Sequence, residues 1–139
     1  MGRKEIGARC AAIEECYEFL LAYAGKGVSG DAGSTGPVRA QLARAVEALS
    51  GLASAYSAAV KQENLQPVQS YRAFLEVLER DASDSIAAIR LVLAQTTISS
   101  QLIDNLNASI HFRALLTDLF LIDEILRPQG TQASSVTTS

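Results

Sequence analysis

The single histidine, His111, is the residue best suited to acid–base or metal chemistry, because an imidazole titrates near neutral pH and binds metals. Asp104 and Asn107 precede it at helical spacing, so the three side chains would share one face of a helix. Such a set could coordinate a metal or orient a proton relay. A polar stripe is also the ordinary outer face of an amphipathic helix, and we prefer that interpretation.

Two known kinds of site, a di-iron site and a dinucleotide site, are excluded because the residues they need are not at the required positions. Di-iron helical bundles use Glu-x-x-His pairs, but the residue three positions before His111 is Ala108. Gly25, Gly27 and Gly30 match the G-x-G-x-x-G pattern, but a helical segment precedes them where a dinucleotide site needs a strand. We therefore predict no metal and no cofactor, and an enzyme that uses Asp104 and His111 remains the least favoured reading.

The two cysteines, Cys10 and Cys16, fall in one predicted helix, about 9 Å apart along its axis and on different sides. They cannot form a disulfide with each other if that helix forms. Cys10 fits the apolar seam of the helix as a core residue, whereas Cys16 joins His111 as a candidate for a cofactor-binding or redox role. This use of cysteine indicates a reducing, cytoplasmic location.

Composition narrows the class of protein. The chain has 139 residues, of which 48% are hydrophobic and 19% charged, so it fits one globular domain. Its net charge is −3 and its basic residues are scattered, which argues against nucleic-acid binding. We find no apolar run of about 20 residues and no apolar segment after the charged N-terminus, so we predict neither a membrane span nor a signal peptide.

Apolar residues recur every three or four positions through most of the chain, which predicts helices. The first predicted helix covers Arg3–Ala24, and the Gly-rich run Gly25–Gly36 follows it as a flexible connector. Pro37 then begins a second helix that reaches about Glu63, and Pro67 begins the next. The core must be aliphatic, because Trp is absent and other aromatic residues are few.

The stretch from Val68 to Arg127 contains neither glycine nor proline, so it is either one long rod or a hairpin whose turn other residues make. The hydroxyl-rich run Gln95–Ser100 can end one helix and cap another, which favours the hairpin. The sequence therefore predicts an all-α, up-down-up-down four-helix bundle. Residues 1–127 would form its single domain and residues 128–139 a disordered tail.

The last predicted helix changes character after His111, where apolar residues cover most of its circumference. A helix that is apolar nearly all round is usually buried nearly all round, so we expect a second chain to cover its far side. The predicted interface consists of Leu115, Leu116, Leu119, Phe120, Ile122 and Leu126.

These patterns favour a non-enzymatic bundle that works through helix-mediated protein–protein contacts, in an adaptor, assembly or regulatory role. We expect a homodimer or a helical protein partner. The alternative is a bundle that binds an apolar ligand or cofactor between its helices, with His111 or Cys16 as a ligand. Whether one chain or two complete the bundle stays open at this point.

Overall fold

Within residues 2–27 and 36–130, which the computed structural model describes, every regular element is a helix. In chain order these are α1 (Gly2–Ala24), α2 (Gly36–Leu49), α3 (Leu52–Gln62), α4 (Val68–Leu93), α5 (Ser100–Ala108) and α6 (Ile110–Gly130). The all-α prediction is confirmed. The predicted count of four helices is wrong, because the second and fourth predicted helices are each divided in two.

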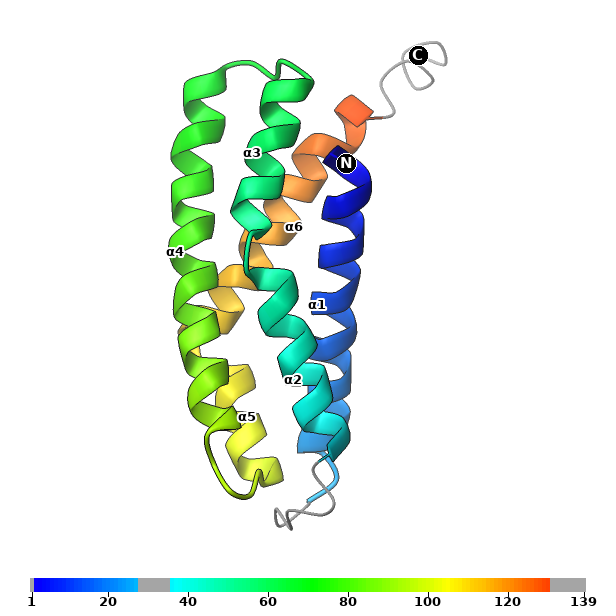
Figure 1. The fold of residues 1–139 in the computed structure, drawn as a ribbon, viewed down its shortest axis with the longest axis vertical. Coiled ribbons are helices and arrows are strands. Elements are labelled where there is room, and N and C mark those ends of the chain that lie inside the picture. Colours follow the sequence, from blue (N-terminus) through cyan, green and yellow to red (C-terminus); the bar gives the residue numbers. More distant parts are fainter. Residues whose placement is uncertain (1, 28–35, 131–139) are drawn as a thin grey trace.

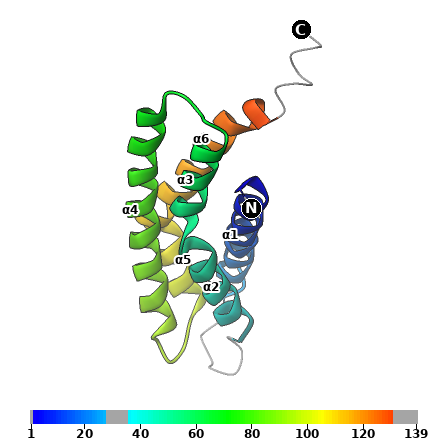
Figure 2. The same ribbon diagram turned by 45° about the horizontal axis from the view of Figure 1, so that its top comes forward.

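The helices lie side by side along the long axis of the molecule (Figure 1). In that view α1 runs downward, α2 and α3 return upward, α4 runs downward, and α5 and α6 return upward. Figure 2 places α4 and α1 on opposite flanks, with the other helices between them. Accordingly α1 packs against α2, α3 and α5, whereas α4 packs against α2, α3 and α6.

The core between these helices is mainly aliphatic, as the composition requires. α1 contributes Ile13, Cys16 and Leu20 to it, all three of which are fully buried. Tyr17, which is half-buried, packs beside Phe112 of α6 with ring centroids 6.0 Å apart. The wide buried face of α1 therefore follows from its having helices on more than one side.

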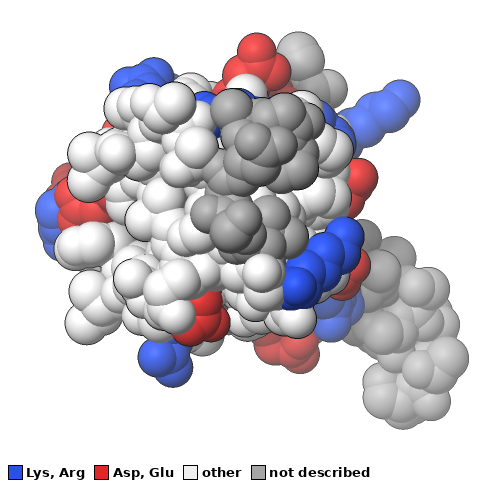
Figure 3. All heavy atoms as spheres, turned by 90° about the horizontal axis from the view of Figure 1, so that it is seen from below, with Lys and Arg blue, Asp and Glu red and all other residues white. Residues whose placement is uncertain are grey.

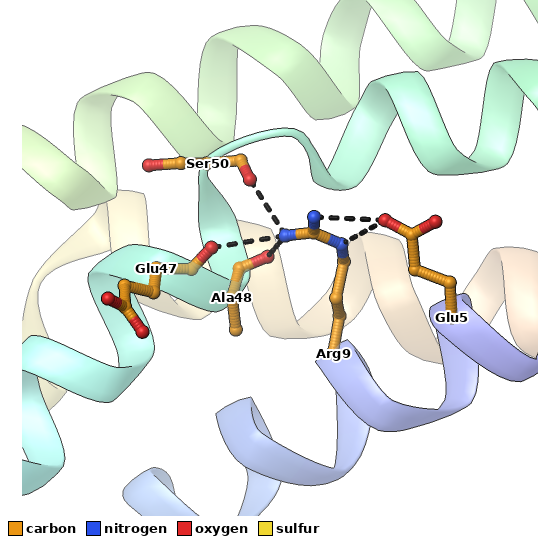
Figure 4. A network of polar contacts seen from close by, with 5 residues as sticks. All are labelled: Glu5, Arg9, Glu47, Ala48 and Ser50. Carbon is orange, nitrogen blue, oxygen red and sulfur yellow. Dashed lines mark hydrogen bonds and ion pairs between the residues drawn. The ribbon is translucent and has the colours of Figure 1, made fainter.

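The second predicted helix is broken at Ser50 and Gly51, where Gly51 has a positive φ of 89°. Arg9 of α1 fills the break (Figure 4). Its guanidinium donates to the carbonyl oxygens of Glu47 at 3.1 Å, Ala48 at 3.0 Å and Ser50 at 2.7 Å. Because carbonyls at a helix end lack partners within the helix, the arginine replaces the hydrogen bonds that the break removes.

The turn predicted within Gln95–Ser100 is confirmed, so Val68 to Arg127 is not one rod. α4 ends at Leu93, and Ser99 caps α5 by accepting a hydrogen bond from the backbone N–H of Leu102 at 3.1 Å. Arg39 of α2 donates to the carbonyl oxygens of Leu93, Gln95 and Thr96, and thus ties the turn to α2.

A second break, at Ser109, was not predicted. Ser109 is extended, with a ψ of 140°, and its hydroxyl accepts a hydrogen bond from the N–H of Phe112 at 3.3 Å, which caps α6. The polar stripe expected on one outer face is not continuous: Asn107 is buried, whereas Asp104 on the same helix α5 and His111 on α6 are exposed.

Helix boundaries differ slightly from the predicted ones at the prolines and at the C-terminus. α2 begins one residue before Pro37, and Pro67 precedes α4 as its N-terminal cap rather than as its first residue. α6 includes residues 128–130, which the sequence assigned to the tail. The remainder of that tail and residues 28–35 of the predicted connector, with Gly30, lie outside the described residues.

Charges of both signs are interspersed on the surface. Figure 3 views the molecule from the end where the α4–α5 turn lies and shows blue and red side chains spread around the rim, without a large patch of either sign. No helix in the described ranges combines the length and the apolar character needed to cross a bilayer.

We predict that Arg9→Met destabilises the protein by about 2 kcal/mol, because it leaves the carbonyls at the α2 end without a partner. The melting temperature should fall by about 6 °C in a thermal unfolding measurement. Arg44→Met is the matched control, since Arg44 is 51% exposed and lies 3.5 Å from Glu15 in a surface ion pair of small value. Equal effects of the two substitutions would contradict the role given to Arg9.

Two glycines should respond in opposite ways to alanine. Gly51→Ala is expected to destabilise by about 1 kcal/mol or more, because its φ is positive and a Cβ would lie 3.4 Å from the Arg9 guanidinium. Gly7→Ala, at a position in α1 with open space around the Cβ, should stabilise by about 0.5–1 kcal/mol. Urea unfolding curves measure both, and a stabilised Gly51→Ala protein would refute the strained turn.

Candidate interaction surface

The predicted interface on α6 is mostly inside the protein. Of its six residues, only Phe120 is exposed, at 60%; the rest belong to the chain's own core, namely Leu115, Leu116, Leu119, Ile122 and Leu126. These five are not on the surface of the folded chain, so of the six predicted residues only Phe120 is exposed to a partner. α6 is apolar nearly all round because one flank packs against α4 and another contacts α1 through Phe112 and α3 through Asp123.

A different set of apolar residues on α6 is exposed. Ile110 is 75%, Leu121 51% and Ile125 43% exposed, in addition to Phe120. At about 100° per residue Phe120, Leu121 and Ile125 project from one side of the helix within two turns, whereas Ile110 lies about 15 Å away along the axis. Phe120, Leu121 and Ile125 form an apolar ridge, which we call the α6 ridge.

Beside the ridge lies an apolar groove of about 350 Å³ between α4 and α6. We call it the α4–α6 groove; its lining consists of Pro67, Ser70, Tyr71, Phe74, Leu121, Ile122 and Ile125. Tyr71 and Phe74 are half-buried. The groove therefore offers aromatic and aliphatic surface directly next to the protruding side chains of α6.

Two carboxylates meet in the same α4–α6 seam. Asp118 of α6 is only 9% exposed and one of its oxygens, Oδ2, has no hydrogen-bond partner in the structure. Burial, followed by a hydrogen bond and charge repulsion from Asp81 of α4, raises the pKa of Asp118 to about 7. Asp118 lies one helical turn before Ile122, so the pair is adjacent to the groove.

His111 lies further along this seam and on the surface. It is half-exposed, its Nδ1 is 3.6 Å from Asp84 Oδ2, and its backbone carbonyl accepts a hydrogen bond from Ser85 at 3.1 Å. The predicted partners do not join it, since Asn107 is buried and Asp104 is exposed on α5. Among the described residues no three His, Cys, Asp or Glu side chains are placed to hold a metal.

A buried polar chain joins three helices and was not predicted. Tyr56 of α3 donates to Asp123 Oδ1 of α6 at 2.6 Å, so the thiol of Cys10, 3.4 Å away, donates to the tyrosine oxygen. Burial is the main cause that raises the pKa of Tyr56, and the hydrogen bond with Asp123 adds to it. No sequence signal could predict these hydrogen bonds, because Cys10 and Tyr56 are 46 positions apart and Tyr56 and Asp123 are 67 apart.

Both thiols are held in the neutral form. Burial raises the pKa of Cys10 to about 11 and that of Cys16 to about 12. Cys16 is fully buried on α1, away from the exposed His111, so the two candidate cofactor ligands do not converge. A neutral, buried thiol is a poor nucleophile and a poor metal ligand.

A second hollow, of about 340 Å³, lies at the turn between α3 and α4. Polar side chains such as Lys61, Asn64 and Arg72 line it together with apolar ones such as Val60 and Leu75. Its mixed lining suits an apolar ligand less well than the α4–α6 groove does.

We predict that Cys10 and Cys16 of the folded protein react slowly with iodoacetamide at pH 8, because about one Cys10 thiol in a thousand, and fewer for Cys16, is ionised there. Mass spectrometry of timed samples measures the labelling, and the same protein in denaturing urea is the control. Rapid labelling of Cys16 in the folded state would restore it as a redox candidate.

No protein-family model, no curated protein and no solved structure matches this chain. Its function must therefore be argued from the geometry of the α6 ridge, the α4–α6 groove and the acid pair beside them.

Proposed function

We propose that this chain is an up-down-up-down helical bundle without enzymatic activity, which acts in the cytoplasm through helix-mediated protein–protein contacts and forms a homodimer. The role would be that of an adaptor, an assembly factor or a regulator. The observation that carries the proposal is the α6 ridge, where Phe120, Leu121 and Ile125 are exposed next to an apolar groove.

Exposed apolar side chains of this size favour association. Burying a Phe, Leu or Ile side chain contributes roughly 1.5–3 kcal/mol, and folded monomers rarely leave several such residues together in water. Isolated exposed residues such as Leu21 on α1 need no such explanation, since scattered apolar residues are normal on a protein surface.

A second copy of the chain is the occupant we propose for this surface. The ridge projects and the groove beside it is concave, so a two-fold contact would let each ridge enter the groove of the other copy. The charges fit this arrangement, because Glu124 on the exposed side of α6 is already paired with Arg127 at 3.2 Å. Two such faces would meet with little like-charge repulsion.

The polar groups of the chain are not placed as a catalytic site would need, which favours a role in protein–protein contacts. The thiols are neutral and buried, and His111 stands on the surface beside Asp84 rather than in a cleft. An acid or base that serves catalysis needs a site where substrate and water access are controlled.

The second candidate function is binding of a small apolar ligand in the α4–α6 groove, which its lining of Tyr71, Phe74 and Ile125 favours. At about 350 Å³ it is near the lower end of ligand pockets, and it lies away from both Cys16 and His111. An apolar dye would then bind the wild-type monomer, whereas a dye signal that disappears on dimerisation favours the first proposal.

We predict that Leu121→Glu weakens the dimer at least about tenfold without unfolding the chain, because a charge would be buried in the interface. Leu21→Glu is the matched control, since Leu21 is 49% and Leu121 51% exposed. Leu119→Glu, at a position that is 1% exposed, should instead destabilise the fold.

Sedimentation equilibrium at micromolar concentration measures the dimer, and circular dichroism measures the fold. A wild-type protein that stays monomeric would contradict self-association. A dimer that loses equal affinity through Leu21→Glu and Leu121→Glu would place the interface elsewhere.

A further inference from the structure

We propose that the hollow at the turn between α3 and α4, which we call the α3–α4 hollow, binds a small phosphate monoester. Lys61 and Arg72 hold the phosphoryl group, and the apolar part of the ligand lies against the aliphatic wall of the hollow.

The α3–α4 hollow is formed where one helix ends and the next begins. α3 ends at Gln62 and α4 begins at Val68, and the turn between them is at the top of Figure 1. Lys61 comes from the last turn of α3, Asn64 from the connection and Arg72 from the second turn of α4. A volume of about 340 Å³ is near the lower end for small-ligand sites, so the hollow suits a small molecule rather than a helix.

The charge of the hollow favours an anion. Among the described residues that line it, Lys61 and Arg72 are basic and none is acidic, although the whole chain has a net charge of −3. The acid nearest to Lys61 in the chain, Glu63, is engaged elsewhere, because both of its oxygens accept hydrogen bonds from Arg3 at 2.7 Å. In the part of the chain that the structure describes, neither Lys61 nor Arg72 takes part in an ion pair.

A second hollow, next to this one, has no excess of positive charge. It is lined by Arg72 and Arg80 but also by Glu76 and Glu79, so its charges balance. Arg72 borders both hollows. An anion gains more on the side where Lys61 adds a second positive charge and no carboxylate opposes it.

Uncharged donors add to the two cations. Ser57 supplies a hydroxyl, which has no hydrogen-bond partner among the described residues. The side-chain oxygen of Asn64 accepts from Gln66 Nε2 at 3.2 Å, which leaves the Asn64 amide N–H groups available to an acceptor. The end of α3 and the start of α4 carry opposite partial charges that largely cancel, so the side chains set the preference for an anion.

A phosphate monoester matches the two cations better than a carboxylate does. It carries a charge of about −1.5 to −2 near pH 7, whereas a carboxylate carries a single negative charge and would neutralise only one cation. The planar guanidinium of Arg72 can bind two phosphate oxygens at once, and the ammonium group of Lys61 can bind the third terminal oxygen.

The remaining wall of the hollow favours a ligand with an apolar part. Val60, Leu65 and Leu75 border the hollow and are otherwise buried in the protein. An aryl or short alkyl group on the phosphate would cover this wall, whereas inorganic phosphate would leave it in contact with water.

The inference does not rest on the proposed dimer. Tyr71 and Phe74 line the α4–α6 groove, whereas Arg72 and Leu75 line the α3–α4 hollow. At about 100° per residue the two pairs point to different sides of α4. The α3–α4 hollow is therefore open in a monomer and in the proposed dimer alike, and failure of the dimer would leave the phosphate site standing.

Isothermal titration calorimetry of the full chain with phenyl phosphate, in a phosphate-free buffer of low ionic strength, tests the site. We expect a Kd below about 1 mM. Benzoate has an aromatic ring but a single charge, and inorganic phosphate lacks the ring, so each should bind at least about tenfold more weakly.

Each probe can overturn one part of the inference. A protein that does not bind phenyl phosphate has no such site. Benzoate that binds as tightly as phenyl phosphate would overturn the choice of phosphate. Inorganic phosphate that binds as tightly would overturn the role of the apolar wall.

Lys61→Met and Arg72→Met should each weaken phenyl phosphate binding at least about tenfold, because each removes a charged donor from the phosphoryl group. Arg80→Met is the matched control, since Arg80 is an exposed basic residue two turns along α4 that does not line the hollow. Its affinity should equal that of the wild type, and circular dichroism checks the fold of all three variants. Equal losses in all three would indicate attraction by net charge alone and would overturn the site.

Nuclear magnetic resonance of the isotope-labelled wild type locates the ligand without any substitution, and decides the question if a variant does not fold. Phenyl phosphate should cause its largest shifts at the backbone amides of Lys61, Asn64 and Leu65. Largest shifts at Leu121 and Ile125 would place the ligand in the α4–α6 groove and would overturn the inference.

Discussion

Carbonyl groups at helix ends inside a bundle must find donors, and the arrangement of this protein depends on arginines that supply them. Arg9 reaches from α1 to the end of α2, and Arg39 reaches from α2 to the end of α4. Arg3 donates to the Leu126 carbonyl at 3.0 Å and also binds Glu63. Arg9 and Arg39 thus supply donors at a helix end, and all three guanidinium groups link two helices.

The break at Ser109, where the serine hydroxyl caps α6, decides which surfaces that helix shows. Without the extended residue Ser109, α5 and α6 would be one helix, and the faces before and after it would stay in register. The break instead lets α6 face α4 on one flank and the core on another, so most of its leucines are buried. Phe120, Leu121 and Ile125 are exposed to solvent. Asp118 is buried in the seam, where it interacts with Asp81.

Local sequence signals predicted the elements that depend on local physics. Apolar spacing predicted the helical class, and the hydroxyl-rich run predicted the α4–α5 turn, where Ser99 caps α5 as such residues do. The breaks at Gly51 and Ser109 could not be predicted in this way. Alanine-rich spacing continues across Gly51, and the donor that stabilises its break is Arg9, which comes from another helix. At Ser109 the capping hydroxyl is a single serine of a kind common within helices.

The sequence by itself determined that this chain is helical, aliphatic in its core and rich in apolar residues along its last helix, since these properties follow from composition and periodicity. Only the tertiary structure decided which of those apolar residues face water, because periodicity shows the width of an apolar face and not the number of neighbours that cover it. The same holds for Asp81 with Asp118 and for Tyr56 with Asp123. Such pairs exist only where packing brings distant positions together. Burial then shifts the pKa of the ionisable groups.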